Sequence, residues 1–314
     1  MTVATSEVGL SALQRLWIYQ RERFPLARTA LLLAVFTAAS INVSAHLAGR
    51  PLPAWPSYLV AFVVGLIFFF QLRACDEIKD AEEDRLYRPE RPIPRGLVSL
   101  SLIVGLALAA VPVAILATAA LDLQLLWPLA LVWSWMALMT AEFFVPDWLK
   151  ARPFLYLVSH MLIMPLIDLF VTACEWLTVS GHPPVGLWLF LALSFLNGCV
   201  LEIGRKIYAP ANERTGVETY SALLGPRNAT LLWCAILVAA FAFLIAVAVA
   251  IGAPRLVSAI GFVGLIACLA CGFLFLRAPD AAAQSRIDAM SGLWVLICYG
   301  AAGFAPLVLR WSAP

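Results

Sequence analysis

Long apolar runs are the feature that most limits how this chain can fold. Hydrophobic residues make up 63% of its 314 positions, only 13% are charged, and the polar stretches are too short for a core of their own. Stretches of spanning length predict an all-α integral membrane protein with nine transmembrane helices bundled around a central cavity. We place these helices at about 26–48, 56–74, 97–120, 123–144, 153–174, 185–205, 228–251, 256–276 and 289–310.

Basic residues are distributed unequally between the two sides of such a bundle. If the N-terminus is cytoplasmic, eighteen of the 21 lysines and arginines fall on the cytoplasmic side. Because basic loops stay in the cytoplasm, we predict a multi-pass protein of the inner cell membrane with its C-terminus on the opposite side. Residues 1–24 form an amphipathic cytoplasmic segment, residues 25–314 form one transmembrane domain, and 73–96 and 205–227 are long cytoplasmic loops.

The first long loop concentrates charge beside a membrane-spanning helix. Asp76, Asp80 and Asp84 lie four residues apart. At about 100° per residue, one helical face carries all three over about 12 Å. Carboxylates at a helix C-terminus are unfavourable without a cation, and a row of oxygen ligands suits Mg²⁺ and, through it, a phosphate. The competing interpretation is a solvated loop whose acids pair with nearby arginines.

The second long loop places an acid beside two bases. Glu202 lies one helical turn before Lys206, and Arg205 lies between them. The acid can hold a metal while the bases bind phosphate oxygens, although a basic loop also follows from topology alone. Lys150 and Arg152 add two cations on the same side. A four-helix repeat would bring the two long loops together over one cavity, where we expect the active site.

The motifs of this chain resemble those of the UbiA superfamily of intramembrane prenyltransferases, and the likeness covers nearly the whole length. The first signature of that family is NDxxDxxxD followed by RP and a Pro-Gly turn. It is matched here by Asp76-Glu77-x-x-Asp80-x-x-x-Asp84 and by RPIPRG at 91–96. Asp76 replaces the usual Asn and Glu77 replaces the usual Asp, so both positions keep an oxygen ligand.

Two further segments resemble the family, with one departure. The sequence KARP at 150–153 is similar to the LKxxP segment, and GVET at 216–219 is similar to the G-x-x-T turn after the second acidic motif. That motif normally has two acids four residues apart, whereas this chain has Glu202 and Lys206. Either Glu213 substitutes for the missing acid, or Lys206 replaces one cation in neutralising a diphosphate.

The resemblance implies Mg²⁺-dependent transfer of a prenyl group from an isoprenyl diphosphate to a lipophilic, aromatic acceptor among membrane lipids. It implies neither a nucleic acid nor an obligate protein partner. The departing diphosphate must be neutralised by cations. We predict catalytic roles for Asp76, Asp80, Asp84 and Glu202. The predicted metal ligands are these four with Glu77 and Glu213. The predicted substrate-binding residues are Arg73, Lys150, Arg152, Arg205 and Lys206.

Aromatic side chains could shield an allylic cation from water. The candidates are Phe68, Phe69, Phe70, Trp133, Trp135 and Tyr156. Asp168, within the fifth helix, either binds the acceptor, accepts a proton or forms a helix–helix hydrogen bond. Two other functions are compatible with the pattern: a UbiA-type terpene cyclase that uses the same diphosphate site, and a transporter. Transport is disfavoured because the acids cluster at one face rather than at the bilayer midplane.

Overall fold

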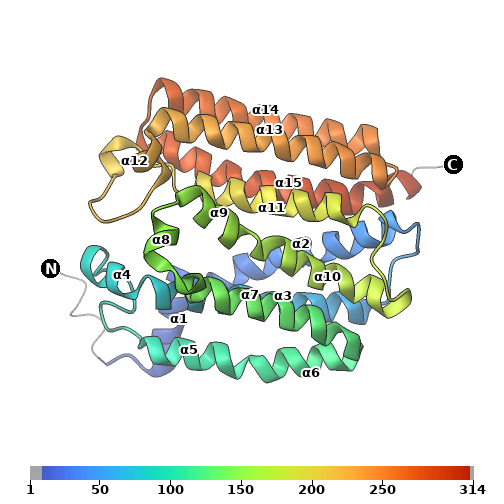
Figure 1. Ribbon diagram of the computed structural model, residues 1–314, viewed down its shortest axis with the longest axis horizontal. Coiled ribbons are helices and arrows are strands. Elements are labelled where there is room, and N and C mark those ends of the chain that lie inside the picture. The colour runs from blue at the N-terminus through green and yellow to red at the C-terminus, as the bar shows by residue number, and fades with distance from the viewer. Residues whose placement is uncertain (1–8, 312–314) are drawn as a thin grey trace.

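The computed structural model describes residues 9–311 as a bundle of long helices that run along one axis (Figure 1). Nine spans in this part of the chain are long and apolar enough to cross a membrane, which confirms the predicted number. They are α2 (Leu26–Leu47), α3 (Trp55–Lys79), α5 with α6 (Leu100–Ala109, Val111–Leu121), η1 with α7 (Leu123–Leu125, Leu126–Thr140), α9 with α10 (Pro153–Met161, Ile163–Val179), α11 (Leu187–Gly204), α13 (Pro226–Ala250), α14 (Pro254–Arg277) and α15 (Ala281–Trp311).

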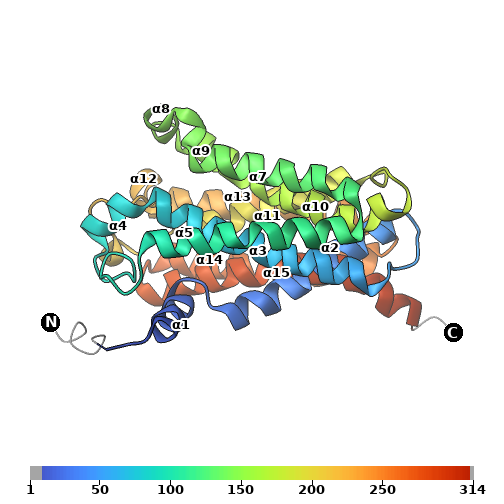
Figure 2. The ribbon, with the colours of Figure 1, turned by 90° about the horizontal axis from the view of Figure 1, so that it is seen from below.

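Short helices gather at one end of the bundle. They are α1 (Ala12–Arg23), α4 (Ala81–Tyr87), η2 (Glu142–Phe144), α8 (Pro146–Lys150), η3 (Pro210–Asn212) and α12 (Tyr220–Leu224). Figures 1 and 2 both show α1, α4, α8 and α12 at the same end, which we call the loop end. The two long polar loops therefore lie at one end of the bundle, as their positions after the second and sixth spans predict. The placement of the loop end in the cytoplasm stays a prediction.

The spans form a ring. From α2, contacts run through α3, α6, α7, α10, α11, α13 and α14 to α15, and α15 packs back against α2. Gly303 allows this closure, because a Cβ at that position would lie 2.5 Å from the Cα of Ala39. Inside the ring, the fully buried Phe68 packs edge-on against Trp133 and Phe170. Aromatic packing at the centre is thus shown, while a central cavity for a prenyl chain stays a prediction.

Proline breaks two of the spans in the middle. Pro112 follows the break between α5 and α6, and Pro165 follows the break between α9 and α10. A proline lacks the N–H that would bond to the carbonyl four residues earlier, and its ring clashes with that carbonyl. The two halves of the second broken span have different neighbours: α10 packs against α2, α3, α7 and α11, whereas α9 packs against α11 and α8.

Two helices extend beyond the apolar runs that predicted them. Helix α3 continues to Lys79 instead of ending near residue 74, and α15 begins at Ala281 instead of residue 289. Charged residues end an apolar run, but backbone hydrogen bonds continue through them. The acids of the first long loop therefore begin on the last turn of a membrane-spanning helix, which holds them at the bundle surface.

Helix α1 lies within the N-terminal segment that the sequence predicts to be amphipathic, and one of its faces is attached to the bundle. Tyr19 is buried, whereas Trp17 is 62% exposed. Glu22 accepts two hydrogen bonds from Arg95, at 2.9 Å each, so α1 is held against the first long loop. The exposed Trp17 is compatible with contact to lipid, but the membrane-surface position of α1 stays a prediction.

Candidate active site at the loop end

The row of acids keeps its helical spacing across a break in the helix. Asp80 ends α3 and precedes α4, with φ −87° and ψ 2°. Its N–H still donates to the Asp76 carbonyl at 2.9 Å, and the Asp84 N–H donates to the Asp80 carbonyl at 2.8 Å. The i, i+4, i+8 arrangement predicted for one helix is therefore carried by two helices joined end to end.

The arrangement brings the three aspartates into different environments. Asp76 is 37% exposed at its side chain and lies 3.4 Å from Arg73. Asp84 is only 3% exposed at its side chain, where Arg88 donates to Oδ1 at 2.9 Å. Arg91 donates to both Asp84 oxygens, at 2.7 Å for Oδ1. For Asp84 the ion-pair interpretation of the loop therefore holds, because its oxygens are already bound by arginines.

Asp80 lies between the other two and has an altered acidity. Burial raises the pKa of Asp80, and the nearby negative charges of Asp76 and Asp84 raise it further. The positive charges of Lys79 and Lys206 act in the opposite direction. Lys206 belongs to the second long loop, so the two loops are close enough to influence each other electrostatically. A carboxylate under this repulsion would be relieved by a bound cation.

Glu77 does not face these aspartates. It is buried, and its Oε1 accepts a hydrogen bond from Arg23 at 2.7 Å and from the Tyr19 hydroxyl at 3.4 Å. Both partners belong to α1. Successive helical residues are about 100° apart, so the residue after Asp76 points to a different neighbour. The structure assigns Glu77 to the attachment of α1 and leaves it out of the ligand set that we propose below.

Glu202 at the end of α11 is bound on both oxygens. Lys206 Nζ lies 2.8 Å from Oε1, and an Arg205 guanidinium nitrogen lies 2.9 Å from Oε2. Burial acts to lower the pKa of Lys206, but the adjacent Glu202 charge outweighs it and the pKa is raised. Lys206 is therefore held in its charged form. The departure from the acidic motif produces a fixed pair of cations beside Glu202.

Glu213, the other candidate for the missing acid, is bound within its own loop. The Thr219 hydroxyl contacts both Glu213 oxygens, at 2.9 and 2.8 Å. The same hydroxyl accepts the Ala222 N–H at 3.0 Å and so caps α12. The pair explains why a G-x-x-T turn follows the second acidic segment, since Thr219 joins the loop to the next helix. These contacts favour Lys206, not Glu213, as the replacement for the missing acid.

The two long loops touch each other at two places. Arg214 Nη1 lies 3.1 Å from Glu90 Oε1. Gly216 has a φ of +79°, and a Cβ there would meet the Tyr87 ring at 2.2 Å, so only glycine fits against this ring. Loop residues more than a hundred positions apart in the sequence therefore close over the end of the bundle.

The predicted basic residues between the loops divide into two kinds. Lys150 is half exposed and lies 3.6 Å from Glu142. Arg152 stacks on the Trp148 ring at 4.2 Å and donates to the Trp148 carbonyl at 2.9 Å. Lys150 is therefore free to turn toward an anion, whereas Arg152 is engaged by α8.

Lys79 is a basic residue of the site that our substrate-binding prediction omits. Its Nζ lies 5.4 Å from the centroid of the Tyr156 ring. The charges of Asp80, Glu202 and Asp76 all act on Tyr156, so this ring is a common neighbour of both long loops. The sequence signal was present, because Lys79 adjoins Asp80, but nothing local indicated which way its side chain would point.

The aromatic candidates separate into three groups. Phe68 and Trp133 lie in the bundle core, and the Trp133 indole donates to Gln71 at 2.8 Å. Phe69 packs on Phe36 and Phe70 packs on Phe24, toward other parts of the bundle. Tyr156 and Trp135 remain near the loop end, where Trp135 packs against Phe143. Two of the six predicted residues are therefore placed near the charged groups.

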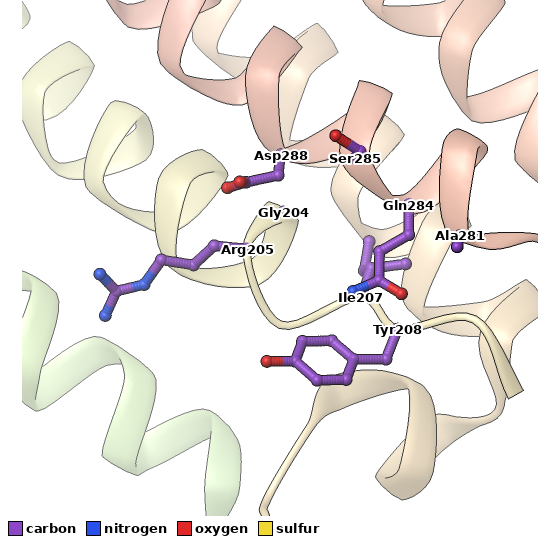
Figure 3. Close-up of a pocket in the computed structure, with 8 residues that line it drawn as sticks. All are labelled: Gly204, Arg205, Ile207, Tyr208, Ala281, Gln284, Ser285 and Asp288. Atoms are coloured by element: carbon purple, nitrogen blue, oxygen red, sulfur yellow. The ribbon is translucent and has the colours of Figure 1, made fainter. Parts of the chain in front are cut away.

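A polar pocket of about 260 Å³ opens beside the second long loop, between the end of α11 and the start of α15. Figure 3 shows Asp288 and Gln284 reaching from α15 toward the end of α11, with the Tyr208 ring below them. Arg205 lines the pocket and also binds Glu202, so the pocket adjoins the charged end of α11. The charge of Asp288 also acts on Arg205.

No ready-made metal cage is found among residues 9–311, because no three His, Cys, Asp or Glu side chains come close enough together to hold an ion. Mg²⁺ seldom uses such a cage. It commonly keeps water and binds through one or two carboxylates together with substrate phosphates. Asp76 and Asp80, whose oxygens are not bound by a close arginine pair, fit this mode.

The chain is similar to known proteins in sequence and in fold. A family model described as the UbiA prenyltransferase family matches residues 31–297. A UbiA homologue from Aeropyrum pernix K1, solved in the apo state, is similar in fold, with a TM-score of 0.65 and 18% identity over 87% of this chain and 98% of that one. A search of curated proteins gives no significant match.

Two further solved structures share the fold. One is of digeranylgeranylglyceryl phosphate synthase, with a TM-score of 0.61 and 14% identity over 92% of this chain and 97% of that one. The other is a UbiA homologue from Archaeoglobus fulgidus bound to DMAPP and Mg²⁺, with a TM-score of 0.56 and 13% identity over 91% of this chain and 99% of that one.

Proposed function

This chain belongs to the UbiA prenyltransferase family, and from that premise we propose that it transfers the prenyl group of an isoprenyl diphosphate to a lipophilic aromatic acceptor within the membrane. The diphosphate ligand and Mg²⁺ of the Archaeoglobus fulgidus homologue support the choice of donor and metal. The positive-inside pattern supports an inner-membrane protein whose loop end faces the cytoplasm.

One observation carries the proposal. The acidic end of α3 and the basic end of α11 lie at the same end of the bundle and close enough for Asp80 and Lys206 to affect each other's acidity. A diphosphate placed between them would find oxygen ligands for its counter-ion on one side and cations on the other. A site that combines carboxylates with cations suits an anionic leaving group and its metal counter-ion better than it suits a lone cation or a lone anion.

The acids would bind the metal ion, and the bases would bind the diphosphate. Asp76 and Asp80 would hold Mg²⁺, which when bound neutralises the charge that develops on the leaving diphosphate. Lys206 and Arg205 would bind phosphate oxygens, and Lys150 would close on them from α8. The donor chain would extend into the bundle, whose interior aromatic side chains exclude water.

Asp84 and Glu202 receive positioning roles in this proposal. Asp84 holds Arg88 and Arg91, and Glu202 holds Arg205 and Lys206. A buried acid that is paired with arginines presents those arginines in a fixed orientation. Loss of either acid would therefore weaken donor binding by releasing the cations it orients.

The test is product analysis with purified protein in nanodiscs. Prenyl diphosphates of several lengths are incubated with Mg²⁺ and a panel of phenols, and products are identified by mass spectrometry. We expect a prenylated phenol and one diphosphate for each transfer, with no product from an Asp80→Asn variant. A cyclic hydrocarbon formed without acceptor would instead indicate a terpene cyclase. Solute flux into liposomes without diphosphate release would indicate a transporter.

A further inference from the structure

The turn between α7 and α8 has a backbone that its sequence does not favour. Glu142, Phe143 and Phe144 have φ values of 47°, 54° and 61°, and none of them is glycine. Each left-handed residue of this kind costs about 1 kcal/mol or more. A turn that only reversed the chain could use glycine or asparagine at no such cost, so the conformation requires a reason.

The conformation buries an acid and exposes an aromatic ring. Glu142 is 8% exposed, whereas Phe144 is 79% exposed. The Glu142 Oε1 atom lies 3.5 Å from the Tyr156 hydroxyl, at the limit of a hydrogen bond. Oε2 is buried, and within the part of the chain that the structure describes it has no hydrogen-bond donor, although Lys150 Nζ lies 3.6 Å away. One carboxylate oxygen is therefore available to a ligand.

The surroundings of Glu142 are aromatic. Tyr156 stacks on His160 with ring centroids 3.9 Å apart and planes at 9°. Phe143 packs edge-on against His160 at 6.1 Å and against Trp135 at 5.4 Å. The His160 Nδ1 atom donates to the Tyr156 carbonyl at 2.9 Å, because a carbonyl can only accept, and this bond fixes the stack. An aromatic ligand would meet flat and edge-on ring surfaces here.

This cluster adjoins the diphosphate site that we propose. Tyr156 is a common neighbour of Glu142 and of the acids of the two long loops, since the charges of Glu142, Asp80 and Glu202 all act on it. Lys79, next to Asp80, lies over the same ring. A molecule that binds Glu142 would therefore lie near the diphosphate end of the donor.

We propose that Glu142 is the catalytic base that removes the proton from the acceptor, and that the left-handed turn exists to place its carboxylate. The inference rests on the proposed function. In the reaction, the bond between C1 of the prenyl chain and the diphosphate oxygen breaks, and its electron pair leaves with the diphosphate. The electron pair of the phenolic acceptor forms the new bond to C1. The proton that the acceptor loses passes to the Glu142 carboxylate, so no oxidant or reductant is needed.

A cation lies beside this base. Lys150 Nζ, on α8, is 3.6 Å from Glu142 Oε2. Removal of the charge from Glu142 should therefore affect bond formation with the acceptor and leave donor binding intact.

The experiment compares Glu142→Gln with Asp147→Asn, which removes the charge of an exposed acid on α8. Donor affinity is measured with the Mg²⁺ complex of a thiolo-diphosphate analogue that cannot ionise. Transfer is measured with the phenol that the wild-type protein uses best. We expect Glu142→Gln to lower kcat at least about 100-fold, with donor Kd within twofold of wild type. Asp147→Asn should match wild type in both.

Two further readouts separate catalysis from structure. The acid limb of the pH profile of kcat/KM for the phenol should be present in wild type and absent in Glu142→Gln. Tyr156→Phe, which removes only the hydroxyl near Glu142, should keep that limb. Transfer by Glu142→Gln within threefold of wild type, or loss of donor affinity in parallel with kcat, would overturn the inference. If wild type itself transfers to no phenol, the proposed function fails instead.

Discussion

Buried acids in the body of the bundle differ from two acids at the loop end, Asp80 and Glu142, in how completely their oxygens are bound. Glu175 receives Arg50 on both oxygens at 2.8 Å and the Ser44 hydroxyl at 2.6 Å. Asp168, which is fully buried, accepts from Ser40 and from Tyr299 on its two oxygens. These side chains join α10 to α2, α15 and the loop that follows α2.

At the loop end, Asp80 and Glu142 have fewer partners for their oxygens. Asp80 is half-buried under the repulsion of two other aspartates, and in the described part of the chain it enters no ion pair. Glu142 keeps one oxygen without a hydrogen bond in a strained turn. A buried acid with all its partners stabilises the fold, whereas one without them destabilises it and is explained by a ligand. The comparison separates structural acids from functional ones without reference to their positions in a motif.

The largest expected effect is on turnover by Asp80→Asn. The amide keeps the shape of the side chain but cannot supply the charge that binds Mg²⁺, so kcat/KM should fall by about 10³-fold or more. Diphosphate release measures turnover, and the melting temperature in detergent measures whether the variant remains folded. Turnover within tenfold of wild type, in protein that remains folded, would refute the role of the acid row.

In contrast to Asp80→Asn, Asp168→Ala should lower stability and leave activity nearly unchanged. It leaves the Ser40 and Tyr299 hydroxyls without their shared acceptor, so the free energy of unfolding should fall by about 1–3 kcal/mol. Activity per folded molecule should stay within about twofold of wild type, because this acid only joins helices. Denaturant titration in detergent gives the first quantity. If activity disappears while stability is kept, Asp168 is a catalytic group and the comparison fails.

Lys206→Asp should lower the rate of transfer less than Asp80→Asn and should change the Mg²⁺ requirement. The substitution restores the family pattern of two acids four residues apart, so transfer should stay within about tenfold of wild type and require more Mg²⁺. Mg²⁺ titration of initial rates measures this, with Arg227→Asp as a control at an exposed basic residue at the end of the same loop. Complete loss of activity with an unchanged Mg²⁺ requirement would show that Lys206 does not replace a cation.

The smallest expected effect is on the pH dependence of stability without metal. Because the folded protein raises the pKa of Asp80, it binds that proton more tightly than the unfolded chain does. The stabilising contribution is complete below the unfolded pKa and is lost as pH rises through the folded pKa.

The measurement is thermal melting in detergent and chelator from pH 4 upward. The melting temperature of wild type should fall relative to Asp80→Asn over the interval between the two pKa values of Asp80, and Mg²⁺ should reverse the difference above it. An unchanged difference between the two proteins across this range would show that the acid is not strained.

Local physics accounts for what the sequence alone determined. The nine spans follow from the length of apolar runs, and the even spacing of Asp76, Asp80 and Asp84 follows from the helical repeat. Both depend on residues near one another in the chain. The resemblance of the motifs to the UbiA family was confirmed for the same reason, because those motifs are short and continuous.

Only the tertiary structure decided which acids remain open to a ligand. The sequence placed Glu77, Asp84 and Glu213 among the candidate metal ligands, but Arg23 from α1, two loop arginines and Thr219 already bind them. It did not single out Glu142, because a left-handed turn built from ordinary residues has no local signal. Whether a carboxylate is free depends on partners distant in the chain, and long-range packing brings those partners together.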